Sequence, residues 1–267
     1  MTRRLRFAPL IAAALLAACR PAPDPGAGGI TQVATIDALL AGAYDGTVTL
    51  AELRQSGDFG IGTFHALDGE MILLDGVFYK VRGDGTVGEP PLSETTPFAS
   101  VTHFRADVRE ELPAGLDLPA LEARIDRLLP QANRFCAFRV RGEFRHVRVR
   151  SVPAQSKPYP PLVAVTRNQP MFTLQGVRGT LIGFRSPTFV KGVNVPGYHL
   201  HFLADDRRSG GHVLEFTAAT STLEADTLHD FLTIRLPAPG AAFEKVDLTP
   251  DRSGELEEAE KNPATRD

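Results

Sequence analysis

The sequence contains no tryptophan, few cysteines and no excess of positive charge. Its formal net charge is −3 and its pI is about 6.2, with acidic and basic residues interspersed. Nucleic-acid binding requires a basic stripe or patch, so this class of function is excluded. No second long apolar span follows the N-terminal one, so contact with a membrane is expected only through an anchor.

The two cysteines are Cys19 and Cys136. Cys19 belongs to the N-terminal motif described next, which leaves Cys136 without a partner for an intrachain disulfide. Cys136 lies between Phe135 and Ala137, and no pattern of basic neighbours marks it as reactive. We therefore interpret Cys136 as a small buried hydrophobic residue rather than a reactive thiol.

The N-terminus has the pattern of a secretory signal, predicted over residues 1–18. Arginines at positions 3, 4 and 6 precede an alanine-rich apolar run, residues 7–18, which is too short to span a bilayer. Leu16-Ala17-Ala18-Cys19 resembles a bacterial lipobox, in which the cysteine is lipidated after cleavage; a plain signal peptide with a chance cysteine is the alternative. Residues 19–29 then form a Pro/Gly/Ala tether. We expect an exported lipoprotein anchored at Cys19 and facing the periplasm or the cell exterior.

The rest of the chain predicts a strand-dominated α+β fold of two mixed β-sheet subdomains with a few short helices. Pro153 to Pro161 is the best candidate boundary, which divides an N-terminal domain (30–155) from a C-terminal β domain (156–267) that carries the site and a short C-terminal helix. The expected helices cover residues 30–40, 50–55, 118–129 and a tail segment from 251. The expected strands cover residues 60–67, 70–74, 77–82, 135–152, 171–184, 197–204, 212–217 and 231–236.

Local signals support some of these boundaries. Asp68-Gly69 and Asp75-Gly76 suit type I′ turns, because both central residues of such turns take positive φ. Thr35 or Asp37 is expected near the start of the first helix. The 118–129 helix has Asp117 as a plausible N-cap and ends before Pro130.

The segment 197–216 is the most informative in the chain. Alternate side chains of a strand share a face, so His199 and His201 point one way while Tyr198, Leu200 and Phe202 point the other. If the following turn centres near positions 206 and 207, residue 212 lies directly opposite residue 201, and cross-strand partners share a face. The spacing therefore predicts that His199, His201 and His212 converge, whereas Glu215 is out of phase and faces away.

Three converging imidazoles predict a divalent-metal site with open coordination positions. Such a site acts as a Lewis acid on bound oxygens rather than as a structural staple. The alternative is three ordinary histidines, and a register slip of one residue would remove His212 from the shared face.

Candidate acids and bases are scattered, and the residues alone leave their roles open. Glu70 begins a strand and its side chain could reach a neighbouring sheet, but the residue alone favours a solvent-facing position. Arg150 shares its strand with other arginines, which are usually just solvated. Glu257, Glu258 and Glu260 lie in a charged tail that could be a frayed helix. Spacing alone indicates only a metal-dependent enzyme.

Several longer motifs resemble the α-acetolactate decarboxylase family over about residues 30 to 261. These are the segments 57–64 (GDFGIGTF), 67–70 (LDGE), 150–153 (RSVP), 157–162 (KPYPPL), 183–187 (GFRSP), 191–202 (KGVNVPGYHLHF) and 210–214 (GGHVL). They occur in the family's order and each spans several consecutive residues, so the resemblance is specific.

The resemblance implies a two-domain fold of mixed sheets, a zinc ion held by His199, His201 and His212, and usually a homodimer. It assigns the motif glutamate to Glu70 and the catalytic arginine to Arg150. A glutamate of the C-terminal helix also lies near the metal in the family; the alignment favours Glu260, with Glu257 and Glu258 not excluded. Thr63 and Arg150 are expected to contact the substrate. Many family members are cytoplasmic, so the lipobox is a departure.

The implied reaction converts (S)-2-acetolactate, a small-molecule substrate, into (R)-acetoin and CO₂. The metal would chelate the adjacent hydroxyl and keto oxygens and stabilise the enediolate that remains after CO₂ is lost. Arg150 could pair with the carboxylate or act in protonation, and the glutamates are candidates for ligation or proton transfer. Two alternatives from other classes are a lactonase-like metallohydrolase and a non-catalytic zinc-binding lipoprotein.

Overall fold

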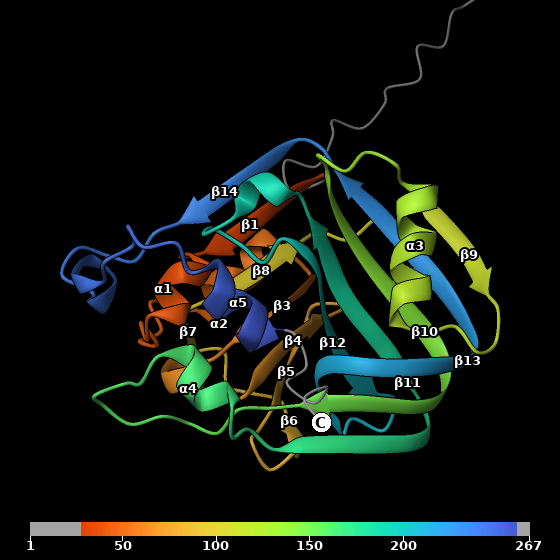
Figure 1. The fold of residues 1–267 in the computed structure, drawn as a ribbon, viewed down its shortest axis with the longest axis horizontal. Coiled ribbons are helices and arrows are strands. Elements are labelled where there is room, and N and C mark those ends of the chain that lie inside the picture. The colour runs from red at the N-terminus through yellow and green to blue at the C-terminus, as the bar shows by residue number, and fades with distance from the viewer. Residues whose placement is uncertain (1–27, 261–267) are drawn as a thin grey trace, which may run out of the picture.

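The computed structural model describes residues 28–260, which form two large β-sheets and one two-stranded sheet with short helices around them (Figure 1). The predicted signal and Cys19 lie outside the described residues. Within the described part, no helix is long and apolar enough to cross a membrane. The strand-dominated α+β fold predicted from the sequence is confirmed.

The first sheet has seven strands in the order β14-β1-β8-β3-β4-β5-β6 and is mixed, because β1 and β14 run parallel while the other neighbours are antiparallel. Its strands are β1 (Gly29–Val33), β3 (Phe59–Thr63), β4 (Glu70–Leu74), β5 (Val77–Val81), β6 (Val87–Gly88), β8 (Ala99–Thr102) and β14 (Phe231–Arg235). A separate two-stranded sheet pairs β2 (Val48–Thr49) with β7 (Thr95–Thr96).

The second sheet is antiparallel and closes on itself. Strand β10 is hydrogen-bonded to both β11 and β13, while β12 joins β11 to β13 and β9 extends the outer edge of β13. The strands are β9 (Val108–Leu112), β10 (Phe135–Arg150), β11 (Met171–Ser186), β12 (Gly197–Ala204) and β13 (Gly210–Leu228). The interior is packed with aromatic rings: Phe144 meets Phe202 and Phe216 edge to face, at centroid distances of 5.5 and 5.9 Å.

In residues 28–260, five α-helices surround the sheets: α1 (Ile36–Leu40), α2 (Leu50–Leu53), α3 (Leu118–Leu128), α4 (Leu162–Thr166) and α5 (Ser253–Glu260). Short 3₁₀ segments cover Arg54–Ser56, His65–Leu67, Thr188–Val190 and Ala242–Lys245. Figure 1 shows α3 beside β9 at the outer side of the closed sheet, with α1, α2, α4 and α5 grouped at the opposite side of the molecule. Asp117 caps α3 by accepting a hydrogen bond from the Ala120 N–H, as predicted.

Two predictions about the N-terminal half are wrong. Residues 30–40 are not one helix: β1 ends at Val33, and Thr35 then caps the five-residue α1. Parallel pairing of β1 with β14 overrides the helical pattern, because it satisfies a backbone that carries β-branched side chains. The 60–67 strand ends early, at Thr63.

The Asp68-Gly69 turn also differs from the prediction, because Asp68 has a φ of −78° and only Gly69 is left-handed at +88°. The connection from β3 to β4 is instead six residues long and includes the 3₁₀ segment. Asp75 and Gly76 do take positive φ, of 51° and 80°, and join β4 to β5 by the predicted two-residue turn.

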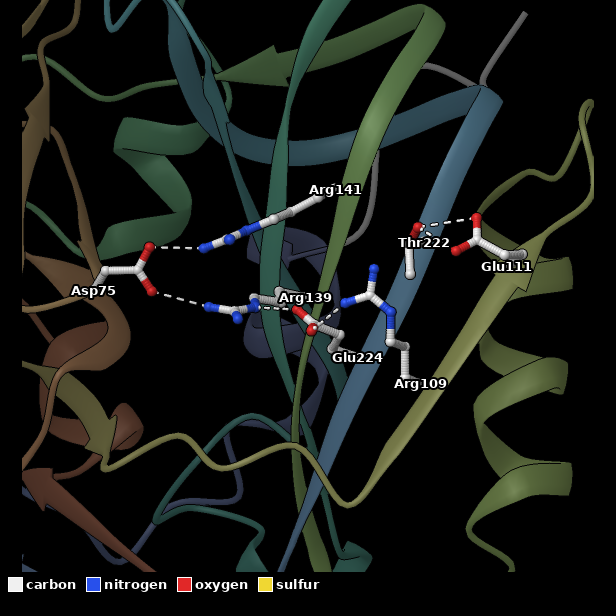
Figure 2. A network of polar contacts seen from close by, with 7 residues as sticks. All are labelled: Asp75, Arg109, Glu111, Arg139, Arg141, Thr222 and Glu224. Carbon is white, nitrogen blue, oxygen red and sulfur yellow. Dashed lines mark hydrogen bonds and ion pairs between the residues drawn. The ribbon is translucent and has the colours of Figure 1, made fainter.

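A network of charged side chains links the first sheet to the closed sheet (Figure 2). Asp75, at the β4–β5 turn, accepts hydrogen bonds from Arg139 and Arg141 of β10, at 2.9 and 2.7 Å. Arg139 continues to Glu224 of β13, which also accepts from Arg109 of β9. The sheets do not divide at residue 155, because β9 and β10 precede that position and belong to the closed sheet, while β14 follows it and belongs to the first. The predicted domain boundary therefore does not follow sheet membership.

Candidate active site

Three neighbouring strands of the closed sheet place site residues in one row. Arg150 on β10 is the register partner of His212 on β13, and His212 is the register partner of His201 on β12. Directly opposed residues lie on the same face with Cβ atoms about 5 Å apart. The register predicted for the hairpin is thus confirmed. Gly211 allows this approach, since its φ is +144° and a Cβ there would lie 2.4 Å from the Arg150 carbonyl oxygen.

The three imidazoles converge as the sequence predicts. Their metal-binding nitrogens lie within 4.8 Å of one another, so His199, His201 and His212 could hold a metal ion. Tyr198, Leu200 and Phe202 face the other way, into the hydrophobic interior of the closed sheet. Glu215 is exposed and lies 3.8 Å from His146, away from the three histidines.

The histidines are neutral, and a backbone contact orients His201. Burial lowers the pKa of His199 to about 3, and burial lowers the pKa of His201 and His212 well below the ordinary value. The His201 Nδ1 lies 2.8 Å from the Met71 carbonyl oxygen of β4. An Nδ1–H donated to that carbonyl leaves the Nε2 lone pair for a ligand, which is the form that transition metals bind.

Two carboxylates approach the histidines from different elements. Glu70, at the start of β4, has its Oε2 3.5 Å from the His201 Nε2. Glu260, the last residue of α5, has its Oε2 3.7 Å from the Nε2 atoms of both His199 and His212. Burial raises the pKa of Glu70 to about 8, with nearby Arg150 opposing the shift and Glu260 adding to it. Burial likewise raises the pKa of Glu260, and Arg150 opposes that shift.

The structure distinguishes the three tail glutamates. Glu260 contacts the histidines, whereas Glu258 forms an ion pair with Arg167 at 2.7 Å and Glu257 is exposed along a neighbouring groove. The side chains three and four residues apart on a helix share a face, so Leu256 and Glu260 both point inward, and Leu256 packs in the core.

Arg150 is a buried cation at the edge of this group, with 4% of its surface exposed. Its Nη2 lies 3.8 Å from the Glu260 Oε2, which is an ion pair but too long for a hydrogen bond. Its Nη1 donates to the Gln169 Oε1 at 3.1 Å. Gln169 follows α4 and has no motif or period around it, so sequence reasoning missed it.

Arg150, the two carboxylates and the three histidines line a cavity of about 40 Å³ between the first sheet and the closed sheet. Thr63 lines it at the end of β3, where its hydroxyl donates to the Gly69 carbonyl at 2.8 Å and its backbone pairs with Glu70. The apolar wall, which the sequence did not reveal as a unit, comprises Ile36, Leu39, Leu67, Phe98, Val152 and Leu162. A larger groove of about 630 Å³ also reaches His199, His212 and Glu260 and is lined by α5.

Comparisons with known proteins agree on one family. The model of the alpha-acetolactate decarboxylase family matches residues 30–250. The chain is 47% identical to the alpha-acetolactate decarboxylase of Methanosarcina mazei over 86% of this chain and 79% of that protein. It is 46% identical to the enzyme of the same name from Methylococcus capsulatus over 86% of this chain and 88% of that protein.

Solved structures show the same likeness. The crystal structure of alpha-acetolactate decarboxylase from Bacillus subtilis strain 168 superposes with a TM-score of 0.85 at 40% identity, covering 88% of this chain and 100% of that one. A Staphylococcus aureus protein described as similar to alpha-acetolactate decarboxylase gives a TM-score of 0.83 at 34% identity, covering 87% of this chain and 100% of that one.

The fold and the site together define a carboxy-lyase that acts on a small-molecule substrate. The chain belongs to the alpha-acetolactate decarboxylase family, and its activity is the decarboxylation of acetolactate. This favours the decarboxylase over both alternatives raised by the sequence, the lactonase-like hydrolase and the zinc-binding lipoprotein.

Proposed function

We propose that the chain converts (S)-2-acetolactate into (R)-acetoin and CO₂ with a divalent metal, zinc, held by His199, His201 and His212. The observation that carries the proposal is the convergence of three neutral, buried imidazoles with two carboxylates and a buried arginine in one cavity. Neutral imidazole is a good zinc ligand, and three such ligands leave open coordination positions. The donor set therefore fits the metal.

When bound there, the metal would supply a Lewis acid beside the adjacent hydroxyl and keto oxygens of acetolactate, where negative charge develops as CO₂ leaves. The protein supplies the rest. The His201 imidazole is held by the Met71 carbonyl, and the apolar wall lowers the local dielectric constant, which strengthens electrostatic interactions inside the cavity.

Arg150 binds the substrate carboxylate in this proposal. Its guanidinium is buried beside the histidines and has only one hydrogen-bonded partner among the described residues, Gln169. A planar guanidinium matches a carboxylate with two parallel hydrogen bonds. The negative carboxylate is favoured next to this cation, and neutral CO₂ is not, so departure of CO₂ releases the interaction.

Glu70 holds the proton that completes the reaction. Burial raises the pKa of Glu70, which favours its protonated form, and the carboxyl lies 3.5 Å from the His201 Nε2. When the carbon–carbon bond to the carboxylate breaks, its electron pair stays on the substrate as an enediolate. Transfer of the Glu70 proton to carbon gives acetoin, and solvent then reprotonates Glu70. Thr63, beside Glu70 in the cavity, contacts the substrate, and the Glu260 carboxylate balances the charge of Arg150 and the metal.

The test replaces the histidines one at a time. His199→Ala, His201→Ala and His212→Ala should each lose bound zinc, measured by atomic spectroscopy, and lose acetoin formation with it. His146→Ala is the matched control, because His146 lies on β10 beside Glu215 and away from the site. Full zinc content and activity in any two of the site variants would contradict the proposal.

We also propose that the chain works as a homodimer and is exported and anchored through a lipidated Cys19. Both proposals come from the sequence: the dimer from the family resemblance and the anchor from the lipobox. Light scattering on the described domain tests the first, and a monomeric mass would contradict it.

A further inference from the structure

The guanidinium of Arg150 is held from one side only. Its Nη1 donates to the Gln169 Oε1 at 3.1 Å, its Nη2 stops 3.8 Å short of the Glu260 Oε2, and its Nε has no hydrogen-bond partner within residues 28–260. Buried arginine and glutamate side chains this close would ordinarily close into a two-bond pair. Here Arg150 and Glu260 do not form a hydrogen bond, and the hydrogen bond from the Arg150 Nη1 goes to the neutral amide of Gln169 instead.

Burial of the Gln169 side chain does not favour the stability of the fold. Only 7% of its surface is exposed, and its Nε2 has no hydrogen-bond partner in the described part of the chain. Burying an amide with an unpaired donor costs free energy, which an apolar side chain of similar size would avoid. The hydrogen bond from Arg150 to the Gln169 Oε1 offsets part of this cost.

The chemistry of the acceptor matters as well. A carboxylate in place of the amide would hold the guanidinium in the same position but would cancel its charge. A neutral acceptor fixes the position and keeps the full positive charge for an anionic ligand. Because Gln169 occupies Nη1, the edge formed by Nε and Nη2 is left available.

We propose that Gln169 is a positioning residue: its hydrogen bond keeps the Arg150 guanidinium from pairing with Glu260, so that the Nε–Nη2 edge of Arg150 binds the carboxylate of the substrate. The proposal rests on the role given to Arg150 in the proposed function. Gln169 itself does not touch the reacting atoms; it acts through Arg150.

The experiment compares two ligands that differ in the carboxylate. The first is 2-hydroxyisobutyrate, a 2-hydroxy acid, and the second is acetoin, which has no carboxylate; each is measured as a competitive inhibitor of acetolactate decarboxylation. In Gln169→Glu, which is isosteric, the inhibition constant of 2-hydroxyisobutyrate should rise roughly 10-fold to 100-fold, as expected for loss of a charge-assisted pair. That of acetoin should stay within about twofold. Gln169→Met, which lacks the acceptor, should show the same separation.

Asn168→Asp is the matched control, since it adds the same charge one residue away on an exposed side chain. It should leave both constants unchanged. Wild-type binding of 2-hydroxyisobutyrate by both Gln169 variants, or a parallel rise for both ligands, would overturn the proposal. Arg150→Met, with binding of 2-hydroxyisobutyrate measured directly by calorimetry, separates the role of Arg150 from that of Gln169. Unchanged binding in Arg150→Met would refute the role of Arg150, whereas lost binding there with wild-type binding in the Gln169 variants would refute the positioning role alone.

Discussion

Replacing Glu260 by glutamine tests how the C-terminal helix contributes to the site. The substitution keeps the size of the side chain and removes its charge. In the structure the Glu260 Oε2 lies 3.8 Å from the Arg150 Nη2 and 3.7 Å from the Nε2 atoms of His199 and His212. The variant therefore leaves Arg150, and any metal on the histidines, without this nearby negative charge.

The size of the effect follows from the 3.8 Å separation of Arg150 and Glu260. Two unit charges at that distance attract by about 4 kcal/mol at an effective dielectric constant of about 20. The cost of burying the carboxylate, which raises the pKa of Glu260, offsets part of this. Glu260 lies equally close to two of the histidine nitrogens that would hold the metal, so the loss of its charge should weaken zinc binding by a comparable net amount, roughly 1.5 to 3 kcal/mol. This corresponds to about 10-fold to 100-fold weaker zinc binding and a similar drop in kcat/KM.

The assay is zinc affinity by competition with a fluorescent chelator, followed by acetoin formation at saturating zinc. Glu257→Gln is the matched control, because it removes the same charge from an exposed position one turn earlier on α5. It should stay within twofold of the wild type in both measurements. Equal zinc affinity and equal kcat/KM for the Glu260 and Glu257 variants would refute the reasoning.

Three further predictions concern separate parts of the molecule. Glu70→Gln cannot transfer a proton, so kcat should fall by about 100-fold to 10,000-fold with unchanged zinc content, measured by steady-state kinetics and atomic spectroscopy. Asp226 is buried, and burial raises its pKa from 3.8 to about 6. Between pH 3.8 and about pH 6, Asp226 is therefore protonated in the folded state and ionised in the unfolded state. Its contribution to stability should therefore fall as pH rises through this window, by at most about 3 kcal/mol, and Asp226→Asn should remove that fall in urea unfolding from pH 4 to 7. Cys19→Ser should release the protein from membranes in fractionation of expressing cells.

Each of these predictions has a contrary result. Wild-type kcat in Glu70→Gln would remove its role as proton donor. An unfolding free energy that changes with pH equally in the wild type and in Asp226→Asn would show that Asp226 is not the group that titrates. Continued membrane association of Cys19→Ser would contradict the lipobox.

The hairpin was predictable from the sequence because its information is local. Strand alternation placed His199 and His201 on one face, and a short polar loop fixed which residue lies opposite His201. The cross-strand pairing of His201 with His212 confirms that register. The same locality explains the success of the α3 helix, whose cap and period lie within a dozen residues.

The partners of the histidines were not predictable in this way. Glu70 and Thr63 reach the site from the first sheet, and Glu260 reaches it from a helix nearly fifty residues beyond the hairpin. No periodicity links segments that far apart, so only family resemblance pointed to them. No sequence pattern around Gln169 indicates a role, because its contact with Arg150 depends on the tertiary placement of the α4–β11 connection.

The errors have physical causes of the same kind. Residues 29–33 form a strand because β14, some two hundred residues later, offers a parallel partner, and tertiary pairing overrides local propensity. The β3–β4 connection is longer than two residues because Ala66 and Leu67 take left-handed conformations, with φ of 60° and 57°, which composition does not predict.

The most direct test of the whole account is acetoin formation from racemic acetolactate by the purified wild-type domain, with and without a chelator. We expect (R)-acetoin and CO₂ from the (S) enantiomer, loss of activity after chelation, and recovery on adding zinc. Absence of acetoin with zinc present, or full activity in protein shown to be free of metal, would contradict it.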